Sequence, residues 1–190
     1  MSLEPWQSGL ILIVLVVVGI FLMCAIARVE EESCGTPDVF DLLCRYSKAL
    51  DALSALRLGA GRMVYISGPM TGKPYLNFAA FDEAERALLL SGYDVHNPVE
   101  INRQHPDMPY EWYMERDLKA VRDSQAVLAL AGWTESRGAK REIALALSRG
   151  LPVICAESGA VIGGTMESRR QIINGVCEEL EGCQECAGGC

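Results

Sequence analysis

The sequence predicts an α/β protein whose parallel sheet of four to five strands carries helices on both faces. Two observations after residue 62 predict this fold: short apolar runs rich in Val and Ile recur along the chain, and stretches with helical periodicity separate them. Strands that alternate with helices in this way form parallel sheets covered on both faces. A long uncharged run near the N-terminus adds a third expectation, a transmembrane helix in front of the domain.

Residues 8–27 read SGLILIVLVVVGIFLMCAIA and carry no charge. At about 1.5 Å per residue, a helix of this length reaches roughly 30 Å, the thickness of the hydrocarbon core of a bilayer. A cleaved signal peptide and a buried core helix are the alternatives, but no Lys or Arg precedes the run and a small domain has little room to enclose it. Arg28, Arg45 and Lys48 follow the run, so we expect a single-pass membrane protein with its C-terminal domain in the cytoplasm.

The chain is expected to have four parts: an anchor at 1–29, a connector with an amphipathic helix at 30–62, the main domain at 63–165, and a C-terminal helix with a Cys-rich tail at 166–190. The connector helix packs on the domain or pairs with another copy of the chain. The tail cysteines (Cys177, Cys183, Cys186 and Cys190) are expected to be reduced in the cytosol. Four thiolates holding zinc and a solvated tail are both compatible with this spacing, and we predict no metal or other cofactor.

The first half of the domain begins with MVYIS at 63–67, a β-rich run that ends at a glycine and a proline. Apolar residues then repeat at helical spacing, at Phe78, Phe81, Ala84, Leu88 and Leu89. This repeat predicts a helix over 77–90, closed by Gly92. Residues 93–96 follow as the second strand.

The second half continues the alternation. Residues 110–123 predict a helix with Tyr113, Leu118 and Val121 facing inward. The remaining elements are a buried strand at 126–131 (AVLALA), a helix at 138–148, a strand at 151–155 (LPVIC) and a helix at 166–180. Right-handed crossovers favour the flavodoxin-like strand order 2-1-3-4 for this Rossmann-like sheet.

In such a sheet the ligand binds beyond the carboxyl ends of the first and third strands, so the loops at 67–74 and 132–138 are the candidate site. The first loop, SGPMTGKP, is rich in small residues that let a ligand approach the backbone, and its candidate substrate-binding residues are Ser67, Gly68, Met70 and Gly72. The second loop leads into a helix whose N-terminus favours an anion, with Ser136 as cap or phosphate donor.

Two carboxylates are expected at the same crevice: Glu142 in the first turns of that helix and Asp117 on the preceding helix. Each has an ordinary structural alternative. Asp117 fits a solvated helix position, Glu142 fits a charge that complements the helix dipole, and Tyr65 fits an aromatic residue of a strand. His96 and His105 are interpreted as loop residues.

The formal net charge of −8 argues against a protein that binds a nucleic acid polymer, which requires a basic surface. It leaves open a small phosphorylated ligand, because one pocket of an acidic protein can be locally positive. The expected partner is therefore a small molecule, besides the membrane.

Three segments together resemble the nucleoside 2-deoxyribosyltransferase superfamily, and in particular its small, often phage-encoded, uncharacterised branch. They are YISGPMTG at 65–72, MERDL at 114–118 and SRGAKREIALALSRGLPVI at 136–154. The resemblance implies that Glu142 is the nucleophile on the anomeric carbon of the sugar. It also implies that Asp117 binds the base or acts as general acid, and that Tyr65 orients the glutamate.

The superfamily also contains 2'-deoxynucleoside 5'-phosphate N-hydrolases, whose phosphate-binding serine and glycine correspond to Ser136 and Gly138. The transferases have an aspartate where Ser136 stands, and this difference favours a nucleotide monophosphate as substrate. Members assemble as dimers or larger oligomers, so the resemblance also implies a homo-oligomer. For the chemistry to work, one carboxyl group must stay protonated while Glu142 is ionised, and we expect the helix N-terminus and Tyr65 to keep the pKa of Glu142 low.

The resulting hypothesis is cleavage or transfer at the N-glycosidic bond of a (deoxy)nucleoside or its 5'-monophosphate. The alternative is a membrane-tethered module that binds a nucleotide without turnover and acts as a sensor. A third hypothesis is an interaction protein whose domain no longer binds a ligand.

Overall fold

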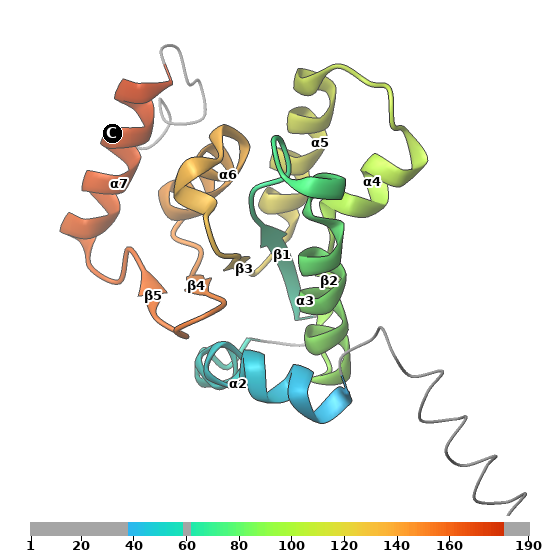
Figure 1. The fold of residues 1–190 in the computed structure, drawn as a ribbon. Helices are drawn as coiled ribbons and strands as arrows, with labels where there is room; N and C mark the ends of the chain where they lie inside the picture. Colours follow the sequence, from blue (N-terminus) through green and yellow to red (C-terminus); the bar gives the residue numbers. More distant parts are fainter. Residues whose placement is uncertain (1–37, 59–61, 181–190) are drawn as a thin grey trace, which may run out of the picture. The chain divides into compact units, whose positions relative to one another are not determined.

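The alternating strands and helices form a five-stranded sheet in the order β2-β1-β3-β4-β5 (Figure 1). The computed structural model describes residues 38–58 and 62–180 of the 190-residue chain. The strands are β1 (Met63–Ser67), β2 (Asp94–His96), β3 (Ala126–Ala129), β4 (Val153–Cys155) and β5 (Val161–Ile162). The pairs among β1 to β4 are parallel, whereas β5 pairs with β4 in the antiparallel sense. The predicted α/β class and strand order are therefore confirmed.

The helices are α2 (Val39–Ala55), α3 (Phe78–Leu90), α4 (Pro98–Gln104), α5 (Tyr110–Asp123), α6 (Arg137–Ser148) and α7 (Met166–Glu179). The sequence did not predict α4 or β5. α4 has seven residues and begins where the Asn97 Oδ1 accepts a hydrogen bond from the Val99 N–H at 3.0 Å, so a cap rather than an apolar repeat defines it. β5 has only two residues, too few for a period-2 pattern to be visible.

Successive side chains of β1 enter two different cores, because neighbouring residues of a strand point to opposite faces of the sheet. Val64 and Ile66 belong to a cluster with residues of α2 and α3. Tyr65 belongs to a second cluster with residues of α5 and α6, and α7 packs beside α6 (Figure 1). The even spacing along the strand thus places Tyr65 and Ser67 on the α6 side of the sheet, which is where the candidate site lies.

The connector helix α2 packs on the domain, which was one of the two options that the sequence left open. Its apolar residues Leu42, Tyr46, Ala49 and Leu53 are buried against β1, α3 and the end of β4. α2 and the elements after it form one compact unit. One residue of the predicted apolar repeat in α3 is wrongly assigned: Leu89 is 54% exposed, because it lies on the outer side of the last turn.

Replacing Leu53 by alanine tests whether α2 is part of the fold. Leu53 is 1% exposed, so Leu53→Ala should lower the free energy of unfolding by about 2–5 kcal/mol in a urea titration of the full chain. The matched control is Phe40→Ala on the same helix, where the side chain is 71% exposed and the expected change is within about 0.5 kcal/mol. Equal, small changes for both variants would contradict this packing.

Several predictions concern parts of the chain outside the described residues: the membrane span at 8–27, the N-terminal part of the connector, and the tail cysteines after Leu180. Within residues 38–58 and 62–180, no helix combines the length and the apolar character needed to cross a bilayer. Cys177 of α7 forms a disulfide, in contrast to the reduced state expected for it.

Candidate active site

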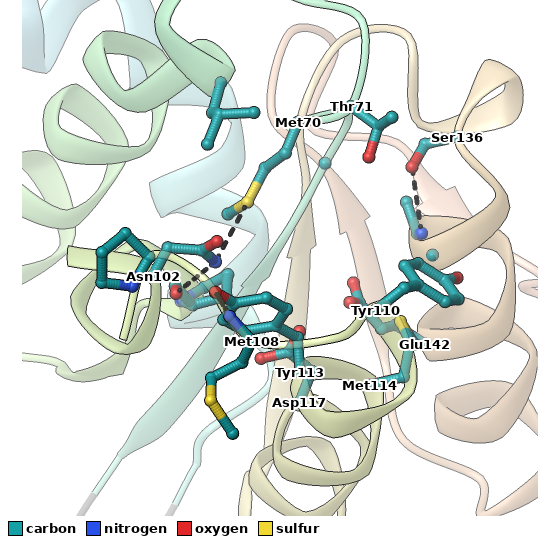
Figure 2. A pocket seen from close by; sticks show the side chains of 16 residues that line it. Met70, Thr71, Asn102, Met108, Tyr110, Tyr113, Met114, Asp117, Ser136 and Glu142 are labelled. Atoms are coloured by element: carbon teal, nitrogen blue, oxygen red, sulfur yellow. Dashed lines mark hydrogen bonds between the residues drawn. The ribbon is translucent and has the colours of Figure 1, made fainter. Parts of the chain in front are cut away.

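A cavity of about 280 Å³ opens beyond the carboxyl end of β1, between the loop that follows this strand and helices α4, α5 and α6 (Figure 2). This front cavity receives side chains from segments far apart in the sequence. Asp117 comes from α5, Glu142 from α6, and Ser136 from the N-cap of α6. Figure 2 shows Ser136 and Asn102 on opposite sides of the cavity.

Glu142 lies at the floor of the front cavity and is 5% exposed. The Ser67 Oγ donates a hydrogen bond to its Oε2 at 2.5 Å. Ser67 is the last residue of β1 and is itself fully buried, so the sheet fixes the position of this hydroxyl. Ser67 therefore fixes the orientation of the Glu142 carboxylate.

Asp117 is 7% exposed and lines the same cavity from the neighbouring helix α5. Its Oδ1 is buried and has no hydrogen-bond partner among the described residues. Burial raises the pKa of Asp117, and the nearby charge of Glu142 raises it further. The two carboxyl groups thus form a buried acid pair whose protonation states depend on each other.

Tyr65 of β1 is fully buried and lies close to both acids. Its hydroxyl has no partner at hydrogen-bonding geometry within the described part of the chain. Burial raises the pKa of Tyr65 well above its ordinary value, and the charges of Glu142 and Asp117 add to this effect. The phenol therefore stays protonated and is positioned close to both acids as a hydrogen-bond donor.

The surroundings of the two acids differ. Burial raises the pKa of Glu142, but the hydroxyls of Ser67 and Tyr65 and the charge of Arg141 oppose this effect. No comparable group lowers the pKa of Asp117. Glu142 is therefore the first of the pair to ionise, and Asp117 keeps the shared proton. The expectation of a low pKa for Glu142 is wrong in sign, because burial outweighs its stabilising partners.

Most of the loop residues predicted to bind substrate lie at the front cavity: Gly68, Met70, Ser136 and Gly138. Ser67 lies behind it and contacts Glu142 instead. Gly72 is not among the lining residues, and its φ of +80° gives a backbone reason for glycine at this turn. Gly68 also has a packing reason, because a Cβ there would lie 2.9 Å from the Leu130 Cβ.

The N-terminus of α6 forms one end of the front cavity. The Ser136 Oγ accepts a hydrogen bond from the Ala139 N–H at 3.3 Å, which leaves its own hydrogen to donate. A Cβ on Gly138 would lie 3.3 Å from the Met114 Sδ, so the glycine keeps this helix end uncrowded. Thr71 approaches from the β1 loop. These groups together can receive an anion.

The sequence did not identify the aromatic wall of the cavity, which Tyr110 and Tyr113 provide from the first turn of α5. Their spacing of three residues places both on one helix face and was the available signal. The Tyr113 hydroxyl donates to the His105 carbonyl and accepts from the Met108 N–H at 3.2 Å. These hydrogen bonds fix the loop between α4 and α5 as a side of the cavity.

Asn102 of α4 was also missed, because that helix was not predicted. Its Nδ2 donates to the Pro98 carbonyl at 3.2 Å and contacts the Met70 Sδ at 3.6 Å. Its Oδ1 is then available to accept a hydrogen bond from a ligand. The His, Cys, Asp and Glu side chains of the described ranges form no group suited to holding a metal ion.

Residues 62–155 match the model of a family described as a domain of unknown function (DUF4406). The matched segment runs from the residue before β1 to the end of β4, so it contains both buried acids, Tyr65 and the N-terminus of α6. Neither a curated protein nor a solved structure matches the chain.

Proposed function

We propose that this protein cleaves or transfers at the N-glycosidic bond of a (deoxy)nucleoside 5'-monophosphate or of the corresponding nucleoside. The observation that carries the proposal is the buried pair of Glu142 and Asp117 at one cavity, with different partners around each acid. Pairs of titratable groups with unequal surroundings supply the separate acid and nucleophile roles that glycosidic cleavage requires. The relation of the DUF4406 domain to the nucleoside 2-deoxyribosyltransferase superfamily is part of this proposal.

In the first step a carboxylate oxygen of Glu142 attacks C1' of the sugar. The C1'–N bond breaks, its electron pair stays on the base nitrogen, and that nitrogen takes the proton of Asp117. The product is a glycosyl ester of Glu142 and a free base. Ser67 and Tyr65 stabilise the carboxylate before the attack and act as positioning residues.

In the second step an acceptor attacks C1' and gives its proton to the Asp117 carboxylate, and the ester bond to Glu142 breaks. Water as the acceptor completes hydrolysis, whereas a second base completes transfer. Asp117 ends the cycle protonated, as it began. The same carboxyl group thus serves as acid in one step and base in the other.

Three features of the front cavity support a nucleoside 5'-monophosphate as its ligand. The volume of about 280 Å³ is close to the lower limit of about 300 Å³ for small-molecule sites. The faces of Tyr110 and Tyr113 offer a wall for a planar base. Ser136, Thr71 and the uncrowded N-terminus of α6 offer donors for a 5'-phosphate.

The direct test incubates the full chain with a panel of nucleosides and 5'-monophosphates and measures free base by chromatography. We expect base release, with the monophosphates preferred. A Ser136→Asp variant keeps an efficient N-cap but sets a negative charge against the phosphate. It should lower kcat/KM for the monophosphate by about 10²-fold or more, with little change for the nucleoside, because like charges in contact cost several kcal/mol.

Two outcomes would contradict the proposal. Binding of a nucleotide without any product over the whole panel would favour the sensor hypothesis instead. Equal losses for nucleoside and monophosphate in Ser136→Asp would contradict the phosphate assignment alone.

A further inference from the structure

The front cavity has a polar side chain at the end away from the α6 N-terminus, namely Asn102 of α4. Asn102 and Ser136 lie on opposite sides of the cavity, and Asp117 lies between them (Figure 2). In a nucleoside 5'-monophosphate the base and the phosphate arm leave the sugar at C1' and C4', on opposite sides of the ring oxygen. A phosphate at Ser136 and a sugar at the two acids therefore direct the base toward Asn102.

The wall around Asn102 is otherwise apolar. α4 and the loop that follows it contribute four described residues to the cavity lining: Pro98, Asn102, Pro106 and Met108. Among these four, Asn102 alone has a polar side chain. The hydroxyl of Tyr113 is already used beside this wall, because it donates to a carbonyl and accepts from an N–H of the same loop. Polar recognition of a base at this end therefore depends on Asn102.

Both amide hydrogens of Asn102 are engaged within the protein. Its Nδ2 donates to the Pro98 carbonyl at 3.2 Å and contacts the Met70 Sδ at 3.6 Å (Figure 2). A carbonyl oxygen only accepts a hydrogen bond, so the amide atom beside Pro98 is the nitrogen and not the oxygen. The half-buried Asn102 side chain therefore offers a ligand its Oδ1, which is an acceptor.

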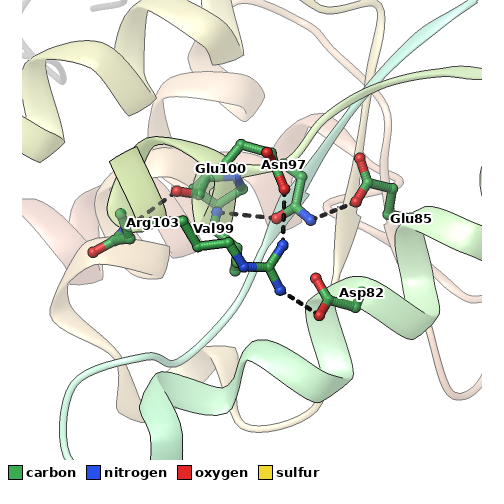
Figure 3. A network of polar contacts seen from close by, with 8 residues as sticks. Asp82, Glu85, Asn97, Val99, Glu100 and Arg103 are labelled. Atoms are coloured by element: carbon green, nitrogen blue, oxygen red, sulfur yellow. Dashed lines mark hydrogen bonds and ion pairs between the residues drawn. The ribbon is translucent and has the colours of Figure 1, made fainter. Parts of the chain in front are cut away.

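Hydrogen bonds and an ion pair hold α4 against α3, so Asn102 is presented from a fixed helix (Figure 3). Just before α4, the Asn97 Nδ2 donates to the Glu85 Oε2 at 2.9 Å. At the other end of α4, the Arg103 Nη2 donates to the Asp82 Oδ2 at 2.5 Å. Both acceptors belong to α3. A hydrogen-bonding group held in this way discriminates between ligands, because it does not turn to suit each of them.

We propose that Asn102 selects a base with an exocyclic amino group at the edge farthest from the sugar, so that cytosine and adenine nucleotides are the preferred substrates. This inference rests on the proposed function. The amine at C4 of cytosine or C6 of adenine donates to the Asn102 Oδ1. Uracil, thymine, guanine and hypoxanthine carry a carbonyl oxygen at the same place. Two acceptors then face each other with no hydrogen between them, and both lose a partner.

Two pairs of substrates that differ at this edge test the inference. They are the 5'-monophosphates with cytosine and uracil, and those with adenine and hypoxanthine, each offered with ribose and with 2'-deoxyribose. Base release by the full chain is measured by chromatography, and kcat/KM is compared within each pair. The bases also differ in how readily they leave, so the decisive quantity is the change of this ratio in Asn102→Leu, which has a similar size and no acceptor. The variant should lower the ratio of amino to oxo substrate by about 10–100-fold in each pair that the wild type cleaves.

Asn174→Leu is the matched control, because it makes the same chemical change at an exposed position of α7 and should keep the wild-type ratios. Thermal melting shows which variants are folded, and Asn102→Ala replaces Asn102→Leu if the larger side chain prevents folding. A wild-type chain that releases no base from any substrate contradicts the proposed function. A wild-type chain that releases base, with the ratios unchanged in a folded Asn102 variant, contradicts the role of Asn102 alone.

Discussion

Replacing Glu142 by glutamine is expected to lower base release by roughly 10³–10⁶-fold, the range seen when a nucleophile is removed from an enzyme that acts through a covalent intermediate. The amide of glutamine has the shape of the carboxyl group, and its oxygen can still accept the hydrogen bond from Ser67. It carries no negative charge and does not form the glycosyl ester. The loss should appear in kcat, because the rest of the front cavity is unchanged.

The measurement is single-turnover release of base from the preferred monophosphate, together with the melting temperature of the variant. Glu178→Gln serves as control, because it makes the same chemical change at an exposed position of α7. We expect wild-type turnover from the control. Turnover of Glu142→Gln within a factor of a few of the wild type would remove Glu142 from the nucleophile role.

The sequence predicted the sheet well because its strands and main helices depend on local signals. The run MVYIS became β1 and the apolar repeat at 110–123 became α5, both within the expected bounds. Once the strand order follows from crossover handedness, the carboxyl ends of β1 and β3 must lie together. That step brought Ser67, Asp117 and Glu142 to one region before any contact was known.

The features that escaped prediction depend on contacts between distant segments. The loop between α4 and α5 is fixed by the hydroxyl of Tyr113, which the helical repeat assigned only to the inward face. Helix α4 is defined by the Asn97 cap and has no apolar repeat that predicts it. Neither feature has a counterpart in residue spacing.

The pKa of Glu142 shows a different limit of the sequence. Of its stabilising partners, the resemblance implied Tyr65, whereas Ser67 and Arg141 were not predicted in this role. The extent of its burial was not predicted, and burial is the larger effect on this carboxyl group. The balance between desolvation and hydrogen bonding is a property of the assembled core, so only the structure shows which one prevails.

Replacing Asp117 by asparagine should separate its effect on stability from its effect on catalysis. In the unfolded chain both acids of the pair titrate near pH 4, and burial raises both folded-state pKa values. Between about pH 4 and the raised pKa values, the folded state binds more protons than the unfolded state, so stability falls as the pH rises through this window. Asp117→Asn removes one of the two titrations. Above the raised pKa the variant should therefore be more stable than the wild type, by up to about 1.4 kcal/mol for each pKa unit of the upward shift.

Urea titrations of the full chain at about pH 5 and about pH 9 measure this difference, since pH 5 lies near the lower end of the window and pH 9 lies above it. Glu115→Gln, an exposed change on the same helix, should keep the wild-type pH dependence. In Asp117→Asn, base release should also fall by about 10²–10⁴-fold, the usual contribution of a general acid. The loss should be smallest for bases that leave readily without protonation, because these need the proton of Asp117 least. An unchanged pH dependence of stability would mean that Asp117 ionises freely in the folded protein, and a loss equal for all bases would mean that it binds the substrate without donating a proton.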